Sequence, residues 1–316
     1  MAAGPIVELA GGVGGAKFAH GLAALVGERL TVVVNTADDL VRHGLEVSPD
    51  HDTVAYTLAG RDDRDRGWGL AGETWIAMEA LGALGGDPWF RLGDRDLATH
   101  LFRTERLRRG ERPTEVAAAL RAALGFAPSI LPMSDEPVRT EVRTDDGWLE
   151  FQDYFVRRRH EPAVRELRFA GVEAARPTPE VAAALEAAAA VLIGPSNPLV
   201  SIGPILALPG LTERLAAARA RGVAVVAVSP IVAGAALKGP ADRMLASLGH
   251  EVSALGVARL YAGIVDAFVI DEADRGLAPA VEALGIRAVV GDTIMRDDAG
   301  RARVARLALD AAGVAR

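Results

Sequence analysis

The chain has 316 residues, half of them hydrophobic and 24% charged, so it can bury the core of one large domain or two smaller ones and is not a disordered chain. Its 35 basic and 42 acidic side chains give a net charge of −7 without a basic block, which argues against nucleic-acid and anionic-membrane partners. The absence of cysteine excludes a disulfide scaffold, a thiolate metal site and a cysteine nucleophile.

No segment of the sequence predicts export or membrane insertion. The first ten residues lack a basic start and a signal-length apolar run, and no later segment has 18 uninterrupted apolar residues. We therefore expect a cytoplasmic protein with no membrane partner.

The first predicted unit is a strand, a glycine loop and a helix. Residues 5–10 form a short apolar run, GGVGG follows, and residues 16–26 are helix formers. Gly11, Gly12 and Gly14 shape this loop, whose backbone amides suit an anion. The spacing matches neither G-x-G-x-x-G nor the Walker loop, so a tight turn without a ligand explains the glycines about as well.

The second predicted strand, at 30–34, is followed by a stretch rich in carboxylates. Asp39, Asp50 and Asp52 lie close together in the sequence, after a strand that should end at the ligand-binding edge of a parallel sheet. Clustered carboxylates at such an edge suggest Mg²⁺ held together with substrate phosphates. Taken one by one, Asp38, Asp39 and Asp50 are more typical of helix or turn caps than of metal ligands.

The middle of the chain interrupts this pattern. Residues 53–124 read as helices joined by polar loops, with no convincing strand. Residues 138–143 and 148–156 then alternate around the turn Asp146-Gly147, which predicts a hairpin. We interpret residues 61–189 as a helical and hairpin insertion.

The strand and helix rhythm returns near residue 190. Buried-strand runs are predicted near 191–193, 223–228, 267–270 and 288–290, with a helix at 211–220. Ser196 and Asn197 follow the first of these strands, where they could contact a diphosphate or simply cap a helix. The prediction is an α/β chain with a doubly wound, mainly parallel Rossmann-like sheet: one domain over 1–316, its core at 1–60 and 190–316.

Ten stretches in order along nearly the whole chain give it a family resemblance: LAGGVGGAKFAHGL, TVVVNTADD, SPDHDTVAYTLAG, RGWGLAGETW, RLGDRDLATH, LPMSDEPVRTEV, FQDYFVRRR, IGPSNPLVSIGPIL, VSPIVAGAALKGPA and GDTIMRD. Together they resemble the 2-phospho-L-lactate transferase family, which makes the deazaflavin coenzyme F-420 from its precursor Fo. The resemblance implies that the ribityl hydroxyl of Fo attacks a guanosine diphosphate-linked three-carbon acid and that GMP leaves. It also implies a homodimer.

The resemblance assigns roles to individual residues. Asp52 and Arg91 match positions that the family uses at the deazaflavin. From the chemistry we add Asp39 and Asp50 to Asp52 as Mg²⁺ ligands, with Asp52 and Asp39 as the catalytic carboxylates. Further substrate contacts are expected from two loops, at Gly11, Gly12, Gly14, Ser196 and Asn197.

Two other function classes are open at this point. The first is a nonenzymatic nucleotide-sugar-binding regulator of the same superfamily, which is not expected to share the PDHDT, LGDRD and FQDYFV stretches. The second is a dinucleotide-dependent oxidoreductase, which the loop spacing and Asn35 at the end of the second strand disfavour. The sequence does not distinguish phospholactate, phosphoenolpyruvate and phosphoglycerate as the three-carbon unit.

Overall fold

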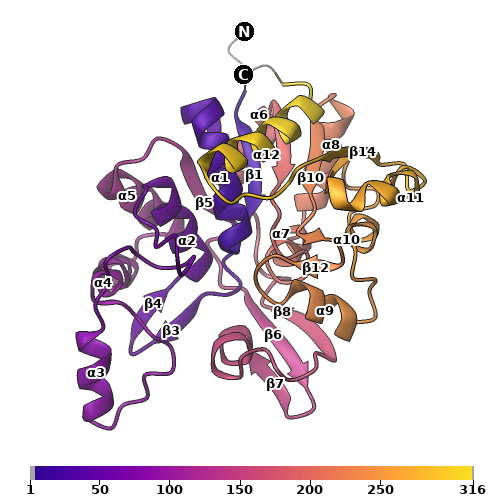
Figure 1. The fold of residues 1–316 in the computed structure, drawn as a ribbon. Coiled ribbons are helices and arrows are strands. Elements are labelled where there is room, and N and C mark those ends of the chain that lie inside the picture. The colour runs from indigo at the N-terminus through magenta and orange to yellow at the C-terminus, as the bar shows by residue number, and fades with distance from the viewer. Residues whose placement is uncertain (1–3, 315–316) are drawn as a thin grey trace.

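The computed structural model describes residues 4–314 and is organised around a seven-stranded parallel sheet (Figure 1). The strand order is β14-β13-β10-β9-β1-β2-β5, and every neighbouring pair is parallel. The bounds are β1 Ile6–Ala10, β2 Leu30–Val34, β5 Ser129–Pro132, β9 Ala190–Ile193, β10 Ala224–Val228, β13 Ala267–Asp271 and β14 Arg287–Gly291. The predicted α/β class with a doubly wound sheet is confirmed.

Helices cover both faces of this sheet, which explains why its strands are apolar runs rather than alternating ones. One face packs against α1 (Gly12–Val26), α2 (Pro49–Leu58) and α12 (Asp298–Ala311). The other face packs against α6 (Pro179–Ala187), α7 (Ile202–Ala207), α8 (Leu211–Ala220), α10 (Ala254–Leu260) and α11 (Ala278–Glu282). Ile6 and Val7, successive residues of β1, are fully buried in the two different layers, as the two-residue period of a strand requires.

The order in which the strands are added reverses next to β1. The chain continues from β1 to β2 and β5 on one side, whereas β9, β10, β13 and β14 extend the sheet on the other. The helices that follow β1 and β9, α1 and α7, pack on opposite faces of the sheet at this switch point. In open α/β sheets this is where ligands bind.

Most of the remaining elements lie around that edge of the sheet (Figure 1). Helices α3 (Ile76–Ala83), α4 (Asp94–Arg108) and α5 (Pro113–Leu124) follow the small hairpin of β3 (Leu40–Arg42) and β4 (Leu45–Val47). A three-stranded antiparallel sheet consists of β6 (Arg139–Thr144), β7 (Gly147–Glu150) and β8 (Glu166–Ala170). The short strands β11 (Ile231–Val232) and β12 (Ala235–Ala236) precede α9 (Ala241–Ser247), and 3-10 turns occupy Gly27–Arg29 and Glu272–Leu277.

Two elements differ from the sequence prediction. Residues 61–189, assigned to an insertion, include strand β5, which pairs with β2 at the edge of the central sheet. With four residues, β5 is too short for its sequence to indicate a strand. The second hairpin strand ends at Glu150, and Asp153–Arg157 form a π-helical turn instead. Phe151 and Phe155 stack 5.5 Å apart across that turn, a four-residue spacing typical of a helix that the alternating pattern concealed.

Among the helices within residues 4–314, none combines the length and the apolar character needed to cross a bilayer.

Candidate functional site

The loops that follow β1 and β9 are packed tightly against each other at the switch point. The Gly11 amide donates to the Ser196 hydroxyl over 3.1 Å, and Ser196 is only 2% exposed. A Cβ atom at Gly14 would lie 2.1 Å from the Pro195 carbonyl oxygen. Gly12 has a φ of +62°, in the left-handed region. These glycines therefore allow close approach of the two loops, whichever ligand lies over them.

Asn197 also serves the loop in which it lies. Its side-chain oxygen accepts from the Leu199 amide over 2.9 Å, and its side-chain nitrogen lies 3.7 Å from the Met244 sulfur. Its backbone carbonyl accepts from Ser201 and Ile202 at the start of α7. The structure thus places Ser196 and Asn197 at the switch point, in a loop that their own hydrogen bonds fix.

Asp50 connects this region to the loop after β2. Its Oδ2 accepts from the Asn35 amide over 3.0 Å, and the same Asn35 group donates to the Val200 carbonyl over 3.3 Å. A Cβ atom at Gly11 would lie 2.4 Å from Asp50 Oδ2, so the carboxylate lies directly against the glycine loop. Asp50 is therefore held between three loops at the carboxyl edge.

The carboxyl groups of Asp38, Asp39 and Asp50, which we call the acidic cluster, are poorly neutralised. Burial raises the pKa of Asp50 to about 6 and that of Asp39 to about 7, while burial and the charge of Asp50 raise the pKa of Asp38 well above its usual range. The Ser48 hydroxyl donates to Asp39 Oδ2 over 2.9 Å. The Oδ1 atoms of Asp38 and Asp39 are buried without a hydrogen-bond partner.

The carboxylates of the acidic cluster are of the chemical type that a hard divalent cation prefers. Mg²⁺ prefers carboxylate oxygens, and unpaired buried carboxylates are stabilised when a cation lies beside them. Asp39 and Asp50, both proposed as ligands from the sequence, belong to the acidic cluster. Asp38 is a further candidate ligand.

Asp52 lies one helical turn into α2 in a different environment. Burial by itself would raise its pKa, but ion pairing with Arg103 and the nearby His51 and His100 hold the pKa of Asp52 well below its usual range. The ring Nδ1 atoms lie 3.3 Å (His51) and 3.6 Å (His100) from the carboxylate. Asp52 is thus ionised and largely neutralised by its own neighbours.

A second group of possible metal ligands includes Asp52. Asp52, Asp96 and His100 each offer an atom within 4.8 Å of the others, and His100 Nε2 lies 3.2 Å from Asp96 Oδ2. This buried group could bind a metal ion. Within residues 4–314 it is the group of three side chains whose ligand atoms lie within 4.8 Å of one another, although Arg103 already pairs with Asp52.

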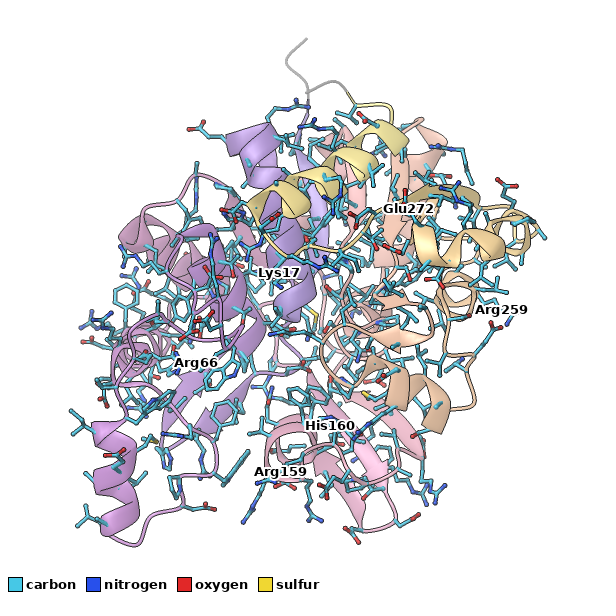
Figure 2. All side chains as sticks on the ribbon, in the orientation of Figure 1. Lys17, Arg66, Arg159, His160, Arg259 and Glu272 are labelled. Carbon is cyan, nitrogen blue, oxygen red and sulfur yellow. The ribbon has the colours of Figure 1, made fainter. Side chains whose placement is uncertain are left out.

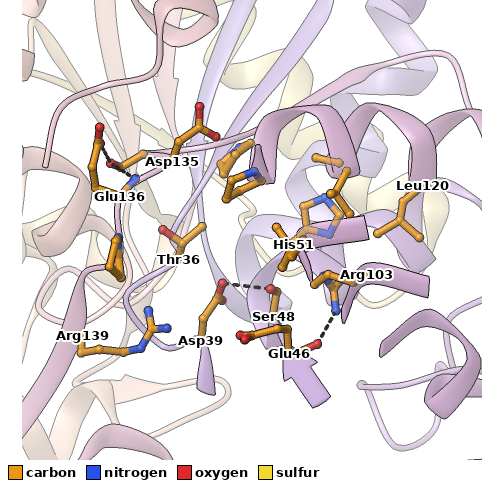
Figure 3. A pocket seen from close by; sticks show the side chains of 17 residues that line it. Thr36, Asp39, Glu46, Ser48, His51, Arg103, Leu120, Asp135, Glu136 and Arg139 are labelled. Carbon is orange, nitrogen blue, oxygen red and sulfur yellow. Dashed lines mark hydrogen bonds between the residues drawn. The ribbon is translucent and has the colours of Figure 1, made fainter. Parts of the chain in front are cut away.

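A cavity of about 260 Å³ opens beside the acidic cluster (Figure 3). Its polar lining includes Asp39, Ser48, His51, Arg103 and Arg139, and the Ser48 hydroxyl donates to Asp39 within this lining. A second cavity of about 170 Å³ shares Asp39 and Arg139 with the first. Asp39 and Arg139 therefore line both cavities, with a carboxyl group and a guanidinium.

Arg91 lies in a separate, exposed part of the molecule. Its guanidinium lies 4.3 Å from the centre of the Trp75 ring, and Arg66 lies 5.1 Å from the ring centres of both Trp75 and Trp68. The two indoles contact edge to face at 6.1 Å. Arg91 thus belongs to a stack of arginines and tryptophans, and no hydrogen bond or ion pair joins it to Asp52 within residues 4–314.

Sequence reasoning missed the partners that define these sites. Arg103, Asp96 and Arg139 come from α4 and β6, 44 to 87 residues beyond Asp52, and no spacing rule connects them to it. The one usable signal is local: Asp96, His100 and Arg103 follow the three- and four-residue spacing that places side chains on one face of a helix.

Comparison with known proteins gives consistent matches over almost the whole chain. The model of the family described as "2-phospho-L-lactate transferase CofD" matches residues 6–303. A 2-phospho-L-lactate transferase from Methanosarcina mazei is 41% identical over 291 residues, 92% of this chain and 94% of the relative. A phosphoenolpyruvate transferase from Kitasatospora aureofaciens is 43% identical over 312 residues, 96% of each chain.

Solved structures show the same fold at greater distance. A UPF0052 family protein from Bacillus halodurans superposes with a TM-score of 0.62 at 16% identity, covering 98% of this chain and 99% of that one. At this identity the likeness shows a shared architecture and no shared activity.

Proposed function

Since the chain belongs to the 2-phospho-L-lactate transferase CofD family, we propose that it transfers a phospholactyl or enolpyruvyl-phosphate group to the ribityl hydroxyl of Fo, in the biosynthesis of coenzyme F-420. The donor in this proposal is the three-carbon acid linked to guanosine diphosphate, and the leaving group is GMP. The hydroxyl oxygen forms a bond to the phosphorus that carries the acid. The bond from that phosphorus to GMP breaks, and the hydroxyl proton is released.

One observation carries the proposal beyond the family: the carboxyl groups of the acidic cluster are buried and only partly neutralised, at the carboxyl edge beside two adjoining cavities. Transfer at phosphorus requires mainly positioning and neutralisation of negative charge. Carboxylates with raised pKa values are a poor environment for an anionic phosphate unless a cation is bound with it. The arrangement therefore supports a metal-assisted reaction.

The residue roles follow from this proposal. In this proposal Asp39 and Asp50 would hold Mg²⁺, which would supply neutralisation of charge on phosphate oxygens, whereas Asp52, the third expected ligand, is already paired with Arg103. Asp52 and Arg91 contact the deazaflavin, with Asp52 and Asp39 as the catalytic carboxylates. Ser196, Asn197 and the loop of Gly11, Gly12 and Gly14 contact the nucleotide end of the donor.

The regulator alternative has less support. The two relatives compared with this chain are named as transferases, and each is matched over more than nine-tenths of its length. The likeness to the UPF0052 protein, in contrast, extends to the fold alone. From the family resemblance we propose that the protein is a homodimer, and light scattering measures its mass in solution.

The test is release of GMP from the guanylylated donors when Fo is present, with and without EDTA. We expect release that stops with EDTA and returns when Mg²⁺ is added in excess. Release that is equal in EDTA would remove the metal from the proposal, and absence of release with every donor would favour the regulator.

A further inference from the structure

A layer of buried polar side chains joins α2 to α4. From α2 it includes Asp52 and Tyr56, which are one helical turn apart, and from α4 it includes Asp96, His100 and Arg103, which share a helix face. Four of these residues are no more than 5% exposed, and the side chain of Asp96 is 14% exposed. Because the desolvation of buried charges offsets much of the gain from pairing them, stability alone is a weak explanation for this layer.

His100 lies between the carboxyl groups of Asp96 and Asp52. Its Nε2 atom is 3.2 Å from Asp96 Oδ2, and its Nδ1 atom is 3.6 Å from Asp52 Oδ2. Arg103 Nη1 lies 3.2 Å from the same Nδ1 atom, and Arg103 Nη2 pairs with Asp52 Oδ1. A guanidinium only donates, so we assign Nδ1 as the acceptor and the ring proton to Nε2, which faces Asp96. The surroundings of the Asp52 carboxylate therefore depend on a ring that Asp96 orients.

Asp96 is itself fixed from two sides. The Tyr56 hydroxyl donates to Asp96 Oδ1 over 2.6 Å, which ties the carboxyl group to α2. The backbone amides of Asp96 and Arg95 donate to the two carboxylate oxygens of Glu73 over 2.7 Å and 2.8 Å. A Cβ atom at Gly93 would lie 2.2 Å from the Glu73 carboxyl carbon, so Glu73 packs directly against the start of α4. Glu73 thus caps α4 and holds the turn from which Asp96 projects.

The cap is reciprocal. Asp94, the first residue of α4, accepts from the backbone amides of Ile76 and Ala77 at the start of α3, over 3.0 Å each. Glu73 lies just before α3 and caps α4, while Asp94 begins α4 and caps α3. The stretches RGWGLAGETW and RLGDRDLATH, which the proposed function uses only at Arg91, therefore interlock through their carboxylates.

The same pair of caps bears on Arg91, the other residue assigned to the deazaflavin. Arg91 lies just before α4, and its guanidinium lies 4.3 Å from the ring centre of Trp75, the residue before α3. Arg66 contacts the same ring, and Figure 2 shows it on the side of the molecule where Figure 1 places α4. The first turn of α4 is therefore a shared support for Asp52 and Arg91.

We propose that Asp96 is a positioning residue for the transfer reaction: through His100 and Arg103 it holds the Asp52 carboxylate in the orientation that the deazaflavin requires. This assignment rests on the proposed function and on the role of Asp52 in it. Asp96 touches no substrate and acts only through Asp52. Displacement of a reacting group by about 1 Å can cost about 10²-fold in rate, so a positioning residue can matter as much as a contact.

The test is whether the effect of Asp96 disappears when Asp52 is already altered. Asp96→Asn keeps an oxygen for Tyr56 and removes the charge beside His100. We expect it to lower kcat for Fo about tenfold to a hundredfold and to leave the affinity for GDP, measured by calorimetry, unchanged. In the Asp52→Asn background the same substitution should lower kcat by no more than about twofold, because residues that act as a unit are not additive.

Tyr56→Phe is a second variant, which removes one hydroxyl from the layer and leaves its charges in place. We expect a fall in kcat of about threefold to tenfold, which again disappears in the Asp52→Asn background. Glu105→Gln is the matched control on α4, since its side chain is 64% exposed and pairs with Arg109. It should have the kcat of the wild type.

The outcomes separate this assignment from the proposed function. Wild-type kcat in Asp96→Asn, or an equal loss with and without Asp52→Asn, would overturn the positioning role and leave the transferase standing. A wild-type protein that does not turn over Fo would contradict both.

Discussion

At the scale of single residues, two aspartates that are two positions apart in the sequence are in opposite electrostatic states. Asp50 lies against the glycine loop and holds its proton to about pH 6, whereas Asp52, on the next part of the same helical turn, is ionised beside Arg103. Burial is the main influence on both; what differs is the presence of a cationic partner. The sequence motif PDHDT therefore contains one carboxylate without a cationic side-chain partner, Asp50, and one that is paired with Arg103, Asp52.

Asp52→Asn should impair both activity and stability. Loss of a charged group that contacts the reacting centre typically lowers turnover about 10²–10³-fold. Removal of one partner from a buried ion pair also costs about 3–5 kcal/mol, because Arg103 stays buried without its carboxylate. Denaturant unfolding measures the second effect.

A double variant separates these two effects. Arg103→Leu in the Asp52→Asn background should recover much of the free energy of unfolding, since neither charge is then left unpaired, and should leave activity low. An Asp52→Asn protein with unchanged stability would show that this ion pair contributes little.

The acidic cluster predicts how stability depends on pH. The pKa of Asp39 is raised to about 7 and that of Asp50 to about 6, against about 3.9 in an unfolded chain. The unfolded state therefore loses these protons first, and the stability that the neutral groups contribute is lost as the pH rises from about 4 through 6 and 7. Without metal, the melting temperature should fall over this interval.

Mg²⁺ should reverse this fall, because it binds the ionised carboxylates of the folded state. Melting curves from about pH 5 to about pH 8, in EDTA and in excess Mg²⁺, measure the difference. Asp39→Asn is the control, and both the fall and the Mg²⁺ response should shrink in it. Parallel curves for the wild type in EDTA and Mg²⁺ would show that the cluster does not hold the metal.

At the scale of elements, the geometry of the switch point depends on the close approach of the loops after β1 and β9. Gly14 meets the Pro195 carbonyl where a Cβ atom would be, and the Gly11 amide is bonded to Ser196. The switch point is therefore formed by backbone packing that glycine alone permits.

Gly14→Ala should test that packing. Its methyl group would lie 2.1 Å from a backbone oxygen, so the two loops must separate, at a cost of about 1–3 kcal/mol by analogy with overpacked cores. Gly82→Ala in α3 is the matched control, because its nearest neighbour is Pro88 Cγ at 3.7 Å. We expect a lower melting temperature for Gly14→Ala and an equal or higher one for Gly82→Ala; equal values for the two variants would contradict the packing argument.

The elements also show what the sequence could and could not predict. The apolar runs at 30–34 and 224–228 and the helix at 211–220 were predictable because burial on both faces and helical propensity act locally. Strand β5 and the turn at 153–157 were not, since a four-residue edge strand carries little pattern and an aromatic cluster fits two periods. Asp39, Asp50 and Asp52 could be singled out by composition, but Arg103 and Arg139 reach them through tertiary contacts that no local pattern encodes.

At the scale of the whole molecule, the carboxyl edge of one sheet brings buried carboxyl groups next to two cavities. The acidic cluster lies after β2, beside the cavities that Asp39 and Arg139 share. Transfer at phosphorus requires neutralisation of negative charge, which carboxylates supply when they hold a metal ion. The family and the electrostatics thus point to the same reaction class.

The most direct test of this account is the mass of the product formed from Fo. The wild-type protein is incubated with Mg²⁺, Fo and each guanylylated three-carbon acid in turn, and the deazaflavin products are separated and weighed by mass spectrometry. The account predicts, for at least one donor, a product heavier than Fo by the phosphate and the three-carbon acid, together with one equivalent of GMP. Unchanged Fo with all of the donors, or a product that retains guanosine, would contradict it.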